Sequence, residues 1–208
     1  MTNASIAAPI LFIDPEAPEP ALIEKAAHEL RAQRLLVVPT DTVYGIAQLV
    51  SCAAEPEDVA RAKQRPAEKG IPLLIANPGD LERYGSAVPN YARDLAAAHW
   101  PGALTLVVHA SPEIPPQFVS EDGSVALRVP AHTITLALLE AAGAPLACSS
   151  ANLAGQPPAT TIEELDPLVA ACVALIVDGG PLSGGVASTV VSCLGEAPLV
   201  LRPGPVTL

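Results

Sequence analysis

Polar side chains gather where a buried strand is predicted to end. The apolar run 35–38 leads into the segment 39–45, which carries two threonine hydroxyls, a carboxylate, a phenol and a glycine. A short, branched apolar run that is closed by proline indicates a buried strand ending in a turn. Ligand sites of α/β folds lie at such strand ends. The segment is therefore either a ligand-binding turn or an Asp-Thr turn that only joins two strands.

Four of the 11 lysine and arginine residues fall within nine positions, namely Arg61, Lys63, Arg65 and Lys69. In a chain of net charge −11, such a local positive cluster is a candidate anion site. Pro66 directs Arg65 away from the helical region, so a helix over 56–64 must end there. Lys63 and Arg65 can then converge on one anion, such as a triphosphate or a leaving pyrophosphate. The alternative is an ordinary solvated surface.

Two further polar loops, at 149–155 and 183–189, border predicted strands. The first offers hydroxyls, an amide and backbone N–H groups suited to phosphate or carboxylate oxygens, although it also fits a simple turn. Arg128 and Arg202 lie in strands that are otherwise apolar, where an unpaired charge is costly to bury. Each arginine is therefore expected to meet a phosphate or a carboxylate, and the carboxylate of a structural Asp is one alternative.

The elements that would position these groups interleave along the chain. We expect helices at 21–33, 56–64, 79–84, 89–99, 132–142 and 160–171. We expect strands at 35–38, 46–50, 72–76, 104–109, 125–129, 145–148, 175–177, 188–193 and 199–202. Because some neighbouring strands form hairpins, the pattern predicts a three-layer α/β domain with a twisted, mixed β-sheet and helices on both faces. The domain is expected at 19–208, after an N-terminal arm at 1–18 with a short edge strand near 11–13.

Composition narrows the classes of function. Half of the 208 residues are hydrophobic and only 3% are aromatic, so the core must be built from small aliphatic side chains. The acidic balance, with 22 Asp and Glu, argues against a general nucleic-acid binder and suits a small-molecule site. The chain has neither a GxxxxGK[ST] nor a GxGxxG motif, and its histidines lack metal-ligand spacing, so no protein-bound metal is expected.

The cysteines and the apolar runs bear on the compartment. The four cysteines, Cys52, Cys148, Cys172 and Cys193, show no CxxC spacing and are expected to be free thiols in a reducing environment. No apolar run approaches membrane-spanning length, and residues 5–13 lack a preceding basic region. We therefore expect a cytoplasmic protein without a membrane partner.

Seven motifs follow one another along the chain. They are P-T-D-T-V-Y-G at 39–45, K-x-R-P at 63–66, W-P-G-x-L-T-L at 100–106, R-x-P at 128–130, S-S-A-N-x-x-G at 149–155, S-T-V-V at 188–191 and R-P-G at 202–204. Together they resemble the YrdC family, the L-threonylcarbamoyladenylate synthases, over about residues 20–205. Because the chain ends just after the last motif, it is similar to the short, single-domain form.

This resemblance implies a fold and a reaction. The fold would be a twisted mixed sheet with a concave central cavity. L-threonine, bicarbonate and ATP, accompanied by Mg²⁺, would give threonylcarbamoyl-AMP and pyrophosphate. The product would serve the t6A modification of adenosine 37 in ANN-decoding tRNAs. By analogy it would pass transiently to the t6A transferase complex, with weak or no direct tRNA binding by this protein.

The matched motifs also imply roles for single residues. Lys63 and Arg65 would be catalytic, acting through charge stabilisation without a covalent intermediate. The ATP-binding set would be Lys63, Arg65, Lys69, Ser124, Ser150, Asn152 and Arg202. The L-threonine-binding set would be Thr42, Tyr44, Arg128, Cys148 and Ser188. The sequence departs from the family pattern at Cys148, Pro158 and Ser192. These departures bear on individual ligand contacts at those positions and not on the implied activity.

Two other functions compete with this one. The first is a non-catalytic nucleotide- or RNA-binding paralogue with the same fold. The intact pairs Lys63-x-Arg65 and Ser150-x-Asn152 argue against it, as does the acidic charge. The second is a carbamoyl-transfer domain of hydrogenase maturation, but such domains lie in much longer chains than 208 residues.

Overall fold

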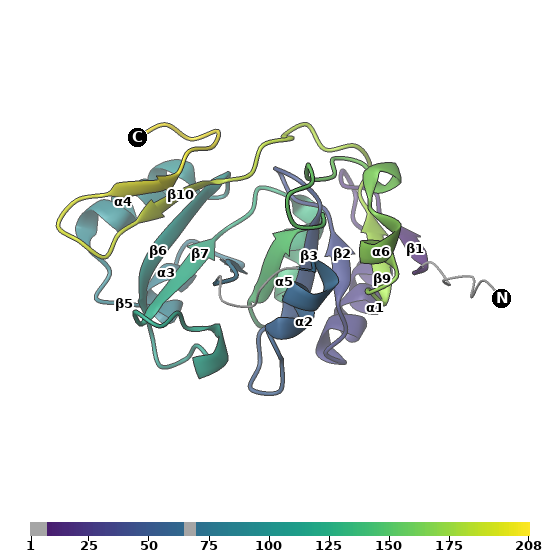
Figure 1. Ribbon diagram of the computed structural model, residues 1–208, viewed down its shortest axis with the longest axis horizontal. Helices are drawn as coiled ribbons and strands as arrows, with labels where there is room; N and C mark the ends of the chain where they lie inside the picture. The colour runs from purple at the N-terminus through teal and green to yellow at the C-terminus, as the bar shows by residue number, and fades with distance from the viewer. Residues whose placement is uncertain (1–7, 65–69) are drawn as a thin grey trace.

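The structure, a computed structural model, describes residues 8–64 and 70–208 (Figure 1). Its strands are β1 (Ile10–Phe12), β2 (Leu36–Val38), β3 (Gly45–Leu49), β4 (Leu73–Leu74), β5 (Gly85–Ser86), β6 (Leu104–Ala110), β7 (Ser124–Arg128), β8 (Leu146–Ser150), β9 (Leu175–Asp178), β10 (Thr189–Ser192) and β11 (Leu199–Arg202). Its helices are α1 (Pro20–Arg31), α2 (Glu57–Ala62), α3 (Asp80–Tyr84), α4 (Asn90–His99), α5 (Thr133–Ala142) and α6 (Pro167–Ala170), with short 3₁₀ turns at Pro116–Phe118 and Ile162–Glu164.

The strands form one mixed sheet in the order β1-β9-β2-β3-β8-β4-β7-β6-β10-β11, with β5 paired to β6. In the antiparallel pair of β3 and β8, Gly45 lies opposite Ser150, so the segment 39–45 ends beside the loop that follows β8. In the parallel pair of β6 and β10, Leu104 lies opposite Thr189. The first pair thus brings two of the predicted polar segments together near the middle of the sheet, and the second places the segment 183–189 beside the start of β6.

Apolar side chains pack on both faces of this sheet. On one face, α1 and α5 bury Ile23, Leu30, Ile134 and Leu138 in a shared cluster. On the other face, α2, α3, α4 and α6 contribute buried side chains to a second, larger cluster. The predicted fold, a mixed sheet with helices on both faces, is confirmed.

The helix before the cationic cluster ends as predicted. Helix α2 stops at Ala62, and Gln64 has a φ of 49°, in the left-handed region. Lys63 therefore lies at the helix C-cap rather than inside a continuous helix. The expected convergence with Arg65 lies outside the described residues.

The predicted helix over 160–171 is wrong. The capping box of Thr161 and Glu164 is present, but it starts only a 3₁₀ turn. Leu165 and Asp166 then take extended conformations, and the short α6 begins at Pro167. The conformation of Asp166 has a local cause, because a residue before proline is disfavoured in the helical region.

The start of the described chain joins the sheet. Strand β1 pairs in parallel with β9 at one edge, where an edge strand near 11–13 was expected. Ile13, just after β1, is fully buried, and its N–H donates to the carbonyl of Asp178. Within residues 8–64 and 70–208, no helix has the length and apolar character needed to cross a bilayer.

Candidate active site

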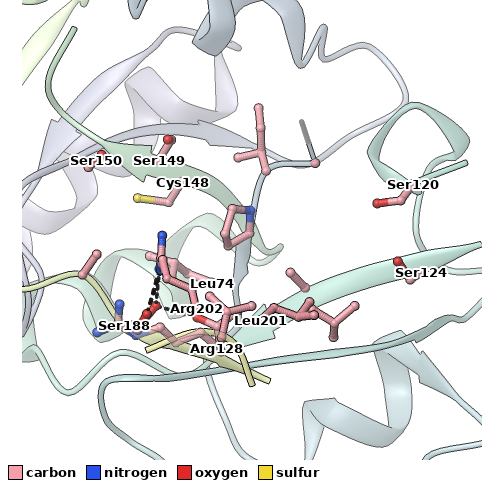
Figure 2. Close-up of a pocket in the computed structure, with 18 of the residues that line it drawn as sticks. Leu74, Ser120, Ser124, Arg128, Cys148, Ser149, Ser150, Ser188, Leu201 and Arg202 are labelled. Carbon is pink, nitrogen blue, oxygen red and sulfur yellow. Dashed lines mark hydrogen bonds between the residues drawn. The ribbon is translucent and has the colours of Figure 1, made fainter. Parts of the chain in front are cut away.

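A cavity of about 780 Å³ lies among the polar segments named above. Figure 2 shows Cys148, Ser149 and Ser150 of β8 on one wall and Arg128, Ser188, Leu201 and Arg202 on the facing wall. Ser120 and Ser124 lie toward the other end of the view. The remaining lining is largely apolar and includes Val107, Phe118 and Val190. The volume falls in the range of about 300–1,000 Å³ that is typical of small-molecule sites.

The structure brings most of the predicted site residues together. Those that line the cavity are Thr42, Ser124, Arg128, Cys148, Ser150, Ser188 and Arg202. Lys63 and Asn152 lie next to this set, in contact with Ser150 or its loop. Arg65 and Lys69 fall outside the described residues, so their assignments stay predictions.

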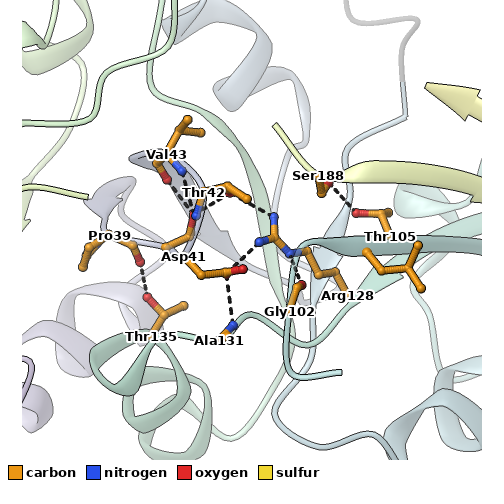
Figure 3. Close-up of polar contacts among 12 residues, drawn as sticks. Pro39, Asp41, Thr42, Val43, Gly102, Thr105, Arg128, Ala131, Thr135 and Ser188 are labelled. Carbon is orange, nitrogen blue, oxygen red and sulfur yellow. Dashed lines mark hydrogen bonds and ion pairs between the residues drawn. The ribbon is translucent and has the colours of Figure 1, made fainter. Parts of the chain in front are cut away.

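Arg128 is held by three neighbours at the cavity wall (Figure 3). Its Nη2 donates to Oδ1 of Asp41 at 2.6 Å, and Nη1 donates to the hydroxyl of Thr42 at 3.1 Å. Its Nε donates to the carbonyl of Gly102 at 2.9 Å. Arg128 therefore meets the structural Asp that the sequence left as an alternative, and it lines the cavity as well.

Arg202 reaches the same wall from β11. Its Nε and Nη2 donate to the carbonyl of Ser188 at 3.1 and 2.8 Å, and Nη2 also lies 3.2 Å from the Ser188 hydroxyl. That hydroxyl is 2.8 Å from the buried hydroxyl of Thr105. Burial, followed by repulsion from Arg128, lowers the pKa of Arg202. Among residues 8–64 and 70–208 no carboxylate forms an ion pair with Arg202, so an anionic ligand is the natural partner of this guanidinium group.

Lys63 links α2 to the loop after β8. Its ammonium donates to the backbone carbonyls of Ser150 and Asn152, the latter at 2.8 Å. The side-chain oxygens of Ser150 and Asn152 each lie 3.3 Å from Nζ. The residue is only 4% exposed, and its own carbonyl accepts from the N–H of Ala154 at 3.1 Å. Lys63 therefore lies behind the wall that carries Ser150, and it fixes the shape of that wall.

Tyr44 does not reach the cavity. Its fully buried phenol donates to the carbonyl of Gly180 at 2.8 Å and accepts from the N–H of Gly179 at 3.2 Å. Burial is the main cause that raises its pKa. The predicted contact between Tyr44 and L-threonine is not supported by this geometry, which ties the segment 39–45 to the end of β9 instead.

Replacing Tyr44 by phenylalanine is expected to cost about 1–3 kcal/mol of unfolding free energy, because the buried Gly179 N–H and the part-buried Gly180 carbonyl lose their partner. The affinity for a ligand of the cavity should be unchanged. Chemical denaturation and ligand titration of the two proteins measure both quantities. A large loss of affinity with unchanged stability would instead restore the predicted contact with the ligand.

Cys148 brings a neutral thiol to the cavity. Burial raises its pKa to about 12, although Arg128 and Lys63 pull the pKa down. The sulfur has room only because residue 45 is glycine, since a Cβ there would collide with Sγ. A thiol of this pKa is not a nucleophile near neutral pH, in keeping with a site that works by positioning.

The thiols are expected to differ in reactivity. In the native protein at pH 8, iodoacetamide should modify the exposed Cys52 and Cys172 and spare Cys148. In denaturant all four cysteines should react, which mass spectrometry of the digested peptides would show. Rapid modification of Cys148 in the native protein would contradict its burial and its raised pKa.

Several cavity residues were missed by the sequence analysis. Thr105 lies within the W-P-G-x-L-T-L motif, and its buried, strand-borne hydroxyl was the available signal. Ser120, Glu121 and Asp122 line the opposite end, in a segment that was read only as a loop. Asp41 lies in the first polar segment, but nothing in the sequence indicated that Arg128 is its partner.

The family of the chain follows from a comparison of its sequence. The family model Sua5_yciO_yrdC, described as telomere recombination, matches residues 28–204. The chain belongs to this family. The resemblance that the seven motifs indicate is thus confirmed over most of the chain.

Named relatives in the Sua5/YrdC family come from several lineages. The chain is 38% identical over 186 residues to the threonylcarbamoyl-AMP synthase of Bacillus subtilis, covering 89% of this chain and 54% of that protein. It is 36% identical over 194 residues to the putative threonylcarbamoyl-AMP synthase of Mycobacterium tuberculosis, covering 93% of this chain and 88% of that protein. The chain thus spans about half of the first relative and most of the second.

A solved structure has the same fold. Sua5 of P. abyssi complexed with L-threonine superimposes with a TM-score of 0.85 at 35% identity, covering 94% of this chain and 57% of that chain. A likeness of this extent supports the YrdC-type architecture, with the central cavity described above.

Proposed function

We propose that the protein is an L-threonylcarbamoyladenylate synthase, which uses L-threonine, bicarbonate and ATP and releases pyrophosphate. Its product supplies the t6A modification of adenosine 37 in ANN-decoding tRNAs, and the protein works in the cytoplasm. The observation that carries this proposal is one cavity in which a pair of arginines and several hydroxyls face the loop held by Lys63. The names of its relatives support the same reaction.

The amino acid binds at the end of the cavity that carries Arg128. Beyond its contacts with Thr42 and Asp41, the Arg128 guanidinium keeps two N–H groups that can donate to a carboxylate, because Nη1 and Nη2 each carry two protons. The hydroxyls of Thr42 and Ser188 lie on the same wall and suit the hydroxyl and carboxylate of L-threonine. Cys148 faces them as an apolar contact. The complex of P. abyssi Sua5 with L-threonine supports an amino acid in this cavity.

The nucleotide occupies the rest of the cavity. Apolar side chains such as Val107 and Phe118 suit a base, and the hydroxyls of Ser120 and Ser124 suit its polar edge or the ribose. Ser150, shaped by Lys63, lies between this region and the amino-acid end. Arg202 lies on the wall that faces Ser150 (Figure 2), and it is the cation available there to the phosphates.

The reaction needs no protein nucleophile. Bicarbonate takes up one proton and gives CO₂ and water. The threonine ammonium loses a proton, its amine adds to the carbon of CO₂, and the nitrogen releases a second proton to leave a carbamate. A carbamate oxygen then attacks the α-phosphorus, and the bond to pyrophosphate breaks. The protein contributes the alignment of the two substrates and stabilises the negative charge that grows on the leaving pyrophosphate.

In this proposal Mg²⁺ binds to the protein together with ATP. Within the described part of the chain, no group of three or more His, Cys, Asp or Glu side chains could hold a metal ion. Phosphate oxygens and water would supply the metal's ligands, as is usual for Mg²⁺ bound with a nucleotide. Glu121 and Asp122 are carboxylates of the cavity lining that would accept hydrogen bonds from such water molecules.

Handover of the product to the t6A transferase complex belongs to the same proposal. Glu121 and Asp122 at the rim of the cavity, together with the net charge of −11, disfavour a stable complex with tRNA. The product would therefore pass through a transient protein contact.

Pyrophosphate release tests the proposed function. Purified protein is mixed with ATP and Mg²⁺, and L-threonine or bicarbonate is omitted in turn. Release that requires both co-substrates supports the synthase. Release without threonine dependence would mean that the amino-acid end is wrongly assigned. No release from folded protein would favour a non-catalytic nucleotide- or RNA-binding paralogue.

A further inference from the structure

Asp41 makes two contacts that no sequence motif assigns to it. Its Oδ1 accepts from Nη2 of Arg128 at 2.6 Å and from the backbone N–H of Ala131 at 3.0 Å (Figure 3). The side chains of Arg128 and Asp41 are only 7% and 15% exposed, so water screens this ion pair weakly. Asp41 does not belong to the cavity lining, whereas Arg128 does. Any effect of Asp41 on a ligand must therefore act through Arg128.

The contacts fix the plane of the guanidinium group. Gly102 accepts from Nε at 2.9 Å, and the hydroxyl of Thr42 accepts from Nη1 at 3.1 Å. Together with Asp41, each of the three nitrogens has one protein partner. One proton on Nη1 and one on Nη2 have no partner among the described residues, so each can donate to a ligand oxygen.

Asp41 also sets the charge of the site. Arg128 and Arg202 line the same wall of the cavity (Figure 2), and the charge of the first contributes to lowering the pKa of the second. Without a counter-ion the two guanidinium groups would carry two positive charges and would favour multiply charged anions such as phosphate. The Asp41 carboxylate balances the charge of Arg128, so this guanidinium suits the single carboxylate of an α-amino acid better than a multiply charged anion.

We infer that Asp41 is a positioning residue that makes the amino-acid end of the cavity selective for a monocarboxylate, by orienting Arg128 and neutralising one of two adjacent guanidinium groups. This inference rests on the proposed function, since it concerns how the same site takes L-threonine. It goes beyond that function because it assigns a role to Asp41 and a preference of the site for one class of anion, the monocarboxylates.

The experiment compares two substitutions of Asp41 by isothermal titration calorimetry. Asp41→Ala removes the orienting contacts and is expected to weaken L-threonine binding by about tenfold or more, with the affinity for ATP changed by less than about twofold. Asp41→Asn keeps an oxygen acceptor but removes the charge. Inorganic phosphate should then bind at least about fivefold more tightly than to the wild type.

Asp80→Asn is the matched control. The Asp80 carboxylate also accepts from a backbone N–H, that of Asn77 at 3.1 Å, and it lies on α3 away from the cavity lining. This substitution changes the net charge as Asp41→Asn does, so it should leave both affinities unchanged. A gain in phosphate affinity in this control would overturn the assignment of the charge effect to Asp41.

A double-mutant cycle tests whether Asp41 acts through Arg128. In the Arg128→Ala background, Asp41→Ala should weaken L-threonine binding no further, because the group it orients is already gone. Additive losses, or equal losses in L-threonine and ATP affinity with a lowered Tm, would overturn the inference and leave Asp41 a purely structural residue. If the wild type binds L-threonine and Asp41→Ala binds it equally well, only the inference fails. If the wild type does not bind L-threonine, the proposed function fails first.

Discussion

Replacing Lys63 by alanine is expected to lower threonine-dependent pyrophosphate release by about 100-fold, because a shift of about 1 Å in a group that positions the substrates can cost that much in rate. The substitution removes the ammonium that joins the carbonyls of Ser150 and Asn152. The loop after β8 then loses the contact that sets the position of the Ser150 side chain in the cavity wall. Single-turnover measurements with saturating substrates would separate a loss of chemistry from a loss of binding.

Two further variants control this prediction. Lys63→Arg keeps the positive charge, but its planar fork does not match acceptors arranged around a single nitrogen, so little activity should return. Lys25→Ala removes a lysine from the exposed face of α1 and should leave activity intact. Circular dichroism and thermal unfolding must show that each variant is folded. Activity of Lys63→Ala near that of the wild type would remove Lys63 from the functional site.

The sequence predicted those features that depend on residues close to one another in the chain, such as helix ends and strands. Pro66 predicted the end of α2, and the end lies at Ala62. The apolar runs predicted the strands of the central sheet, and the polar segments after them do meet at one cavity. Lys63 and the pair Ser150-x-Asn152 lie far apart in sequence, and the family resemblance assigned both to the nucleotide. Their direct contact with each other was not predicted.

Other features depend on contacts that no local pattern encodes. Tyr44 has the same sequence signal as Thr42, but the turn directs its phenol to the end of β9 and away from the cavity. The partner of Arg128 could be a ligand or an Asp, and only the packing of the segment 39–45 against β7 selects Asp41. The capping box at Thr161 was read correctly, but the effect of Pro167 on the following residues was not.

The loop 183–189 has a different role from the one its polar residues indicated. Ser188 lines the cavity, as predicted, but the start of the loop packs directly on the backbone of the segment 39–45. The N–H of Gly185 donates to the carbonyl of Thr42 at 2.8 Å. The loop therefore holds the turn that carries Asp41 and Thr42, and the two polar segments act as one unit.

Gly184→Ala is accordingly expected to reduce kcat/KM for L-threonine by about 30-fold or more, with a stability loss of about 1–3 kcal/mol from overpacking. A Cβ at residue 184 would lie 2.6 Å from the carbonyl oxygens of both Asp41 and Thr42 and 2.7 Å from the Thr42 Cα. These neighbours are backbone atoms, so they can yield only if the whole turn moves. That movement would shift the Asp41 carboxylate and the Thr42 hydroxyl away from Arg128.

Gly195→Ala provides the matched comparison, because the nearest atom to a Cβ there is the carbonyl oxygen of Ala197 at 3.9 Å. It should leave both activity and stability close to those of the wild type. Steady-state kinetics with L-threonine as the varied substrate, together with chemical denaturation, would measure both effects for the two glycines. If Gly184→Ala lost stability but kept its KM for L-threonine, the turn would be able to move without disturbing Arg128. The coupling between this loop and the amino-acid site would then have to be abandoned.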